Sequence, residues 1–140
     1  MTSELNASSL RLEYSIASDG PRITLFGTMS ADIDVLQSVF KRLSHADETI
    51  RLDREPFIIP VGGIQIEAVR ATHNRGLRRT DLFLPYFAWT LSEDEWDDIV
   101  ELITGFHESH LPGHHYLTRL PTDEATVVLS KGEITLNDFS

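Results

Sequence analysis

The sequence contains no cysteine and no long apolar run, and basic residues are scarce in its last third. The absence of cysteine excludes disulfide bonds and thiolate metal sites. No stretch approaches the roughly 18 consecutive apolar residues that a membrane-spanning helix needs. The N-terminal residues lack the basic start and apolar run of a secretory signal. We therefore expect a cytoplasmic protein that does not enter a membrane.

The signatures of common enzyme classes are absent as well. The chain has no G-x-S-x-G, no P-loop and no G-x-G-x-x-G motif. No pair of acidic residues has a spacing that indicates general acid–base catalysis, and nothing indicates a cofactor. These absences favour a binding protein over an enzyme.

Acidic residues exceed basic ones, and the excess is unevenly placed. The chain has 22 acidic and 12 basic residues, which gives a net charge of −10. Residues 93–140 hold eleven of the acidic residues but only two basic ones, Arg119 and Lys131, so their net charge is −9. Such a field repels nucleic acid and anionic membranes and attracts basic proteins. The simpler interpretation is that the charge only aids solubility.

Length and patterning indicate one folded domain with two helices. The 140 residues fit a single domain over 1–140, of which residues 1–8 are expected to fray. Apolar residues at helical spacing predict a helix over 31–45. A second helix is predicted over 93–108, because Ser92 and Glu95 form a capping box at its start.

The remaining segments indicate strands. Residues 10–29 alternate around a turn and predict a hairpin, and residues 63–71 predict a further strand. Residues 81–91 predict an aromatic-rich strand, in which Pro85 marks an edge strand, a bulge or a break. Residues 125–136 predict a last hairpin, whereas "THNRG" is read as a loop. The order predicts an α+β fold, in which a mainly antiparallel sheet of about five to six strands and two amphipathic helices form a two-layer sandwich.

The predicted helix 93–108 has an apolar face and an acidic face. Trp96 lies on the apolar face and is interpreted as a core anchor. The helix dipole explains acidic residues in the first turn but not Asp97, Asp98 and Glu101, which have no lysine at i+4. The acidic face is therefore either a solvated surface or a docking surface for a basic protein. The candidate docking residues are Glu93, Asp94, Asp97, Asp98 and Glu101, with Tyr86 and Tyr116 as possible aromatic anchors.

Four of the six histidines cluster at His107, His110, His114 and His115. His107 and His110 are spaced i, i+3, so a zinc site with His114 or His115 as third ligand is conceivable. The run is not H-E-x-x-H, and histidines near a helix C-terminus interact well with the dipole without any metal. A metal-dependent hydrolase therefore stays an alternative, and no metal is the main expectation.

Arginines gather around Gly76, at Arg70, Arg75, Arg78 and Arg79. Such a loop can hold a phosphate or pair with carboxylates. The negative chain disfavours nucleic-acid binding. We expect the loop to be solvated, or to pair with an acidic surface within the chain or in a second subunit, which would make a homodimer.

The C-terminal third resembles a known family. A helix ending in "ELITGF", followed by "PGHHYL" and a strand-like "ATVVLSKGEI", is similar to the C-terminal part of small bacterial immunity proteins of polymorphic toxin systems. The resemblance covers residues 96–134. It implies an acidic, single-domain inhibitor that docks and blocks a basic toxin or nuclease and carries no catalytic residues. Its specific residues are Gly113, His114, His115, Tyr116, Leu117, Gly132 and Glu133.

Overall fold

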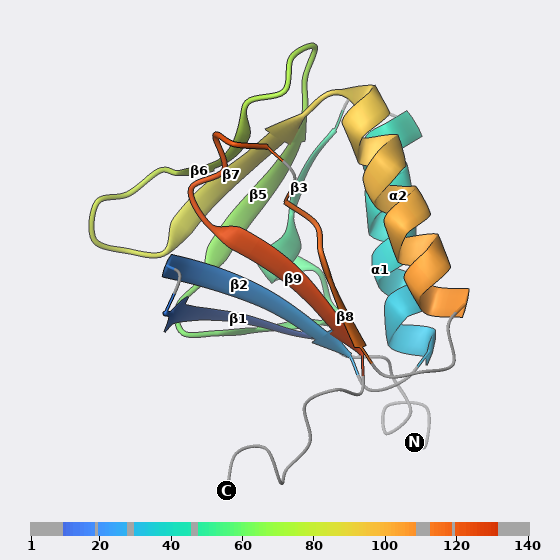
Figure 1. Cartoon of the computed structure of the whole chain (residues 1–140), viewed down its shortest axis with the longest axis horizontal. Helices are drawn as coiled ribbons and strands as arrows, with labels where there is room; N and C mark the ends of the chain where they lie inside the picture. Colours follow the sequence, from blue (N-terminus) through green and yellow to red (C-terminus); the bar gives the residue numbers. More distant parts are fainter. Residues whose placement is uncertain are drawn as a thin grey trace, which may run out of the picture.

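The computed structural model of the chain contains two β-sheets and two α-helices (Figure 1). It describes residues 10–18, 20–27, 30–45, 48–108, 113–118 and 120–131. The α+β class is confirmed. Both predicted helices are present, as α1 (Ser30–His45) and α2 (Glu93–Glu108).

The first sheet has the strand order β4-β1-β2-β9-β8. The predicted N-terminal hairpin forms its centre, since β1 and β2 pair antiparallel and place Leu12 opposite Leu25. These two side chains are buried, as the alternation of apolar and polar residues requires. The strands are β1 (Leu10–Ala17), β2 (Gly20–Gly27), β4 (Ile58–Val61), β8 (Gly113–Tyr116) and β9 (Thr126–Lys131).

The second sheet has the strand order β3-β5-β7-β6. Its central strands β5 and β7 are parallel, and β6 pairs antiparallel with β7. A single 3-10 turn, η1 (Leu52–Arg54), follows β3. The strands are β3 (Thr49–Arg51), β5 (Gln65–Arg70), β6 (Gly76–Arg79) and β7 (Tyr86–Leu91).

The strands differ from the expectation in number and pairing. We expected one mainly antiparallel sheet, but the described residues form two mixed sheets, with parallel pairs β1–β4, β2–β9 and β5–β7. Strand β6 has only four residues, and a period of two cannot be recognised over so short a stretch. Residues 81–85 form a loop before β7, so Pro85 ends the loop and does not interrupt a strand. The return strand of the predicted last hairpin lies outside the described residues.

Gly76 starts β6 in a conformation that favours glycine. Its φ is +81°, and a Cβ there would lie 2.6 Å from the Asp123 Oδ1. The same Oδ1 accepts the Leu77 N–H at 2.7 Å. The close approach of Asp123 therefore joins β6 to the segment that precedes β9.

Both helices and both sheets share one apolar core. The helices run antiparallel, side by side, and pack on each other (Figure 1). The buried stripe of α1 comprises Ile33, Leu36, Val39, Phe40 and Leu43, as its 3.6-residue spacing predicts. No helix among the described residues is long and apolar enough to cross a bilayer.

Candidate functional site

The start of α2 is held by polar contacts around Ser92. The Glu95 N–H donates to the Ser92 Oγ at 3.5 Å, and the Ser92 carbonyl accepts the Trp96 N–H at 3.0 Å. The Ser92 N–H in turn donates to the Asn74 Oδ1 at 2.7 Å. The Ser92 half of the predicted capping box is therefore present, whereas the Ser92 N–H, which the box assigns to Glu95, bonds Asn74 and ties the cap to the loop after β5.

Trp96 fixes α2 to the core. Its side chain is fully buried, and its Nε1 donates to the Val69 carbonyl at 3.1 Å. Its ring stacks on Phe40 with centroids 5.6 Å apart and meets Trp89 edge-on at 5.2 Å. A buried tryptophan needs such a partner for its N–H. Its interpretation as a core anchor is confirmed.

The acidic side chains of α2 point away from this core. At 100° per residue they lie opposite Trp96, Ile99 and Ile103, all of which are buried. The segment Glu93–Glu108 contains no lysine or arginine. We call five of these residues the acidic surface: Glu93, Asp94, Asp97, Asp98 and Glu101. Three of the five are exposed, and Asp97 and Asp98 are half-buried.

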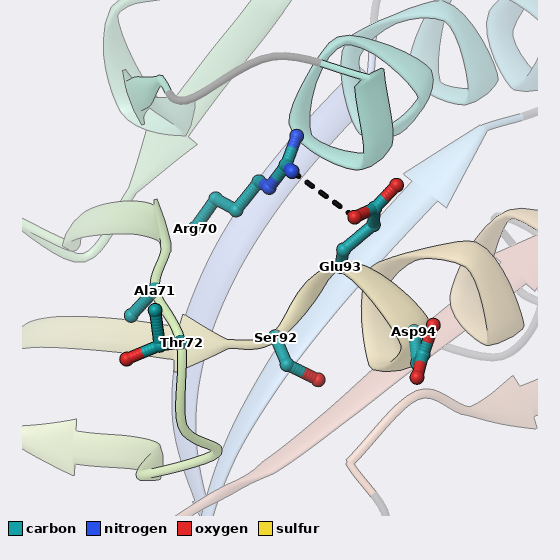
Figure 2. Close-up of a pocket in the computed structure, with 6 residues that line it drawn as sticks. All are labelled: Arg70, Ala71, Thr72, Ser92, Glu93 and Asp94. Carbon is teal, nitrogen blue, oxygen red and sulfur yellow. Dashed lines mark hydrogen bonds and ion pairs between the residues drawn. The ribbon is translucent and has the colours of Figure 1, made fainter.

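One member of the acidic surface is paired within the chain. The Arg70 Nη2 lies 3.1 Å from the Glu93 Oε1, at the edge of an open hollow of about 540 Å³ (Figure 2). Asp94 points away from this pair in Figure 2. The expectation that an arginine near Gly76 pairs with the acidic helix holds for Arg70, and it holds within one chain.

The two tyrosines proposed as anchors lie on different sheets. Tyr86 is half-buried at the first residue of β7, whereas α2 follows the last residue, Leu91. Five further strand residues and Ser92 therefore separate Tyr86 from the start of α2, so Tyr86 does not adjoin the acidic surface. Tyr116 is 51% exposed at the end of β8, in the first sheet.

The histidine cluster is only partly within the described residues. His107 lies in the last turn of α2, and His114 and His115 lie in β8. Of these three, the structure describes the side chain of His115 alone. His110 lies outside the described residues. Among the side chains that are described, no three histidine or carboxylate groups could hold one metal ion. The metal site stays a prediction.

The arginines at 75, 78 and 79 do not converge on one point. Successive residues of a strand point to opposite sides of a sheet, and Arg78 and Arg79 are neighbours in β6. The Arg78 Nε lies 3.4 Å from the Glu124 Oε2. Arg75 is exposed in the loop before β6. A phosphate site built from all three is therefore incompatible with this geometry.

Arg79 instead holds the loop that joins β6 to β7. Its guanidinium donates to the carbonyls of Asp81, Phe83 and Leu84 at 3.0 to 3.4 Å. Its Nη1 also lies 3.5 Å from the Tyr14 hydroxyl of β1. The donors of this side chain are thus turned toward its own loop and not toward a ligand.

Asp81 closes the same loop from the other side. Its Oδ1 accepts the N–H groups of Phe83 and Leu84, both at 2.8 Å. These bonds hold the pKa of the Asp81 carboxyl below its usual value. The loop exposes 88% of Leu82 and 87% of Phe83. Because the apolar letters of "DLFLP" were read as strand, this loop was missed; an aspartate two residues before Phe83 and a following Pro85 are the turn signals.

No family model matches the chain, and neither does any curated protein or solved structure. The resemblance to immunity proteins therefore rests on the sequence pattern alone. Two of its specific residues, Gly132 and Glu133, lie outside the described part of the chain. Function has to be inferred from the surfaces that the fold presents.

Asp53 is a largely buried carboxylate with a structural role. Its oxygens accept two hydrogen bonds from Arg51, at 3.0 and 2.6 Å, and one from the Ile66 N–H at 2.9 Å. Burial raises the pKa of Asp53, but these hydrogen bonds outweigh burial, so that its pKa lies below its usual value. An ionised carboxylate with this many donors ties η1 to β5 and is poorly suited to accept a proton from a substrate.

Proposed function

We propose that this chain is a non-enzymatic binding protein of the inhibitor or immunity type, which docks a basic toxin or nuclease with its acidic surface. The observation that supports this most is the single sign of charge on the outward face of α2. Trp96 holds the opposite face in the core, so the carboxylates are presented from a fixed support.

The arrangement suits long-range attraction better than catalysis. Arg70 offsets the Glu93 carboxylate, but the segment Glu93–Glu108 contains no lysine or arginine, so the helix itself carries a surplus of negative charge. Fields of this kind raise association rates of oppositely charged proteins about 10- to 1000-fold at low ionic strength. They weaken when salt shortens the screening length to about 8 Å. An acidic helix face therefore predicts fast, salt-sensitive binding of a basic protein.

The other two functions have less support. A hydrolase built on His107, His110 and His114 or His115 needs a metal, which elemental analysis of protein purified without a nickel column would detect. A homodimer that pairs the arginines with α2 of a second copy would have to compete with the contacts that Arg70, Arg78 and Arg79 make within the chain.

The test compares two variants that each remove three carboxylates. One carries Asp94→Asn, Asp97→Asn and Asp98→Asn on the acidic surface. The control carries Glu13→Gln, Glu55→Gln and Glu67→Gln, which removes the same charge from other elements. The partner is purified by capture from the source cells, and association is followed by stopped-flow fluorescence.

We expect the acidic-surface variant to fold normally and to associate about tenfold more slowly, or worse, at low salt. The control should slow association much less, because its carboxylates lie elsewhere. Equal rates for wild type and the acidic-surface variant at low salt would refute the docking role of α2.

A further inference from the structure

The loop between β6 and β7 presents large apolar side chains to solvent. Leu82 and Phe83 are 88% and 87% exposed, and Leu84 is 46% exposed. We call these three residues the apolar tip. Single exposed apolar residues are common, but three consecutive ones at the end of a protruding loop are typical of an interaction site (Figure 1).

The loop that carries the apolar tip is tightly braced. Arg79 donates to three of its carbonyls, and the Asp81 side chain accepts the N–H groups of Phe83 and Leu84. The guanidinium also lies over the ring of Phe87, 5.8 Å from its centroid. At the base of the loop the Thr80 N–H donates to the Tyr86 carbonyl at 2.8 Å.

This bracing lowers the cost of covering the tip. Ordering a loop and stripping water from unpaired polar groups are two main costs of association. Here the fold has already ordered the loop, and most of its polar groups are bonded within it. A partner can therefore cover Phe83 while the N–H and the carbonyl of that residue stay paired.

We propose that the apolar tip is an anchor that inserts into an apolar pocket of a partner protein whose rim is basic. The inference deepens the binding function proposed above and rests on it. Because the tip protrudes, its occupant must offer a concave apolar surface.

The charges around the tip specify the rim of that pocket. Asp81 and Glu124 line an open hollow of about 590 Å³ beside Leu82, and both are carboxylates. Arg79 also lines the hollow and keeps its positive charge, and the Glu124 carboxylate is already paired with Arg78. Asp81 bonds the loop amides through its Oδ1, so its Oδ2 can accept a basic side chain of the partner next to the anchor.

The same charges argue against two other occupants. A second copy of this chain also carries a net charge of −10, so two copies repel each other. An anionic bilayer would repel the chain for the same reason. A basic protein is instead attracted by the same charge, within the range that the screening length allows.

The experiment places a photo-reactive benzophenone amino acid at position 83 of the full chain. The matched control carries it at position 59, because Ile59 in β4 is also exposed, at 51%. Both are irradiated in extract of the source cells. We expect a discrete basic protein to crosslink from position 83 and not from position 59. With that protein purified, Phe83→Ser should raise Kd about 30-fold, chiefly through faster dissociation, and Ile59→Ser should leave Kd nearly unchanged.

Several outcomes would overturn the proposal. A crosslinked product with twice the mass of the chain would show that a second copy covers the tip. Flotation of wild type but not of Phe83→Ser with vesicles of phosphatidylcholine and phosphatidylglycerol would show that a bilayer does. A crosslinking yield from position 83 no higher than that from position 59 would show that nothing binds the tip. The acidic-surface variant separates the two proposals. If it associates normally while Phe83→Ser loses affinity, the docking role of α2 fails and the anchor stands; the reverse result removes only the anchor.

Discussion

The two ends of β7 meet solvent in opposite ways. At its start, β7 receives the braced loop with the apolar tip; at its end, Ser92 alone lies between Leu91 and the acidic helix α2. Figure 1 shows the loop and α2 on opposite sides of the second sheet. The loop at the start of β7, which we call the apolar end, bonds its polar groups internally and exposes apolar side chains. Helix α2 at the other end, which we call the charged end, buries its apolar side chains and exposes carboxylates.

This contrast separates two tasks of a binding surface. Charges act over the screening length and mainly set how fast partners meet. Apolar anchors act only on contact and mainly set how long partners stay together. A chain that places them at opposite ends of one strand can alter either property without disturbing the other.

The largest expected effect comes from removing Trp96, the buried side chain that fixes α2 to the core. Trp96→Ala deletes a fully buried ring between Phe40 and Trp89 and leaves a cavity. We expect the free energy of unfolding to fall by about 3–5 kcal/mol, measured by urea denaturation. Asp97→Asn on the outer face of the same helix should change it by less than about 0.5 kcal/mol. A loss below about 1 kcal/mol for Trp96→Ala would mean that α2 is held by other contacts.

The charged end could be predicted from the sequence because its signals are local. Ser92 and Glu95 mark the start of α2, and the spacing of Trp96, Ile99 and Ile103 indicates its buried face. Such signals depend on residues three or four apart, which a helix always brings together. The residues that pack against Trp96 could not be predicted from such local spacing, because Phe40 and Trp89 come from distant segments.

An intermediate effect is expected at the apolar end. Asp81→Ala removes the acceptor of the Phe83 and Leu84 N–H groups, and we expect these two amides to exchange with solvent about tenfold faster. Amides of α2 should not change. Hydrogen exchange followed by NMR measures both regions in one sample, and unchanged protection at Phe83 and Leu84 would contradict the bracing role of Asp81.

Acid should have the same effect on the wild-type loop, with a defined sign. The pKa of Asp81 is lowered in the folded chain by the Leu84 and Phe83 N–H groups, so its contribution is present above the ordinary aspartate pKa. That contribution is lost as the pH falls through the lowered value. The loop amides should therefore stay protected through the usual aspartate range and lose protection only at lower pH, and Asp81→Ala should lack this transition.

At the apolar end, Asp81 and Pro85 are turn signals that indicate a loop, but the form of the loop could not be predicted, because it depends on contacts that are not periodic. "DLFLP" has the composition of a buried strand, and nothing in its spacing shows that Arg79 would engage its carbonyls. The arginine was considered as a ligand for phosphate, whereas its donors are used within the chain. β6 was missed because its four residues are too few to show a period and because the contact of Gly76 with Asp123 joins segments far apart in sequence.

The smallest effect is expected for the ion pair that links the arginine segment to the charged end. Arg70 is mostly covered, with 21% of its side chain exposed, but Glu93 is 56% exposed, so water screens the pair. A double-mutant cycle with Arg70→Met and Glu93→Gln should give a coupling free energy of about 0.2–1 kcal/mol that falls with added salt. Because Glu93→Gln removes the one carboxylate already offset by Arg70, it should slow partner association less than Asp94→Asn does. If Glu93→Gln slows association more, the ion pair is part of the docking surface, and the two ends of β7 differ less than their charges indicate.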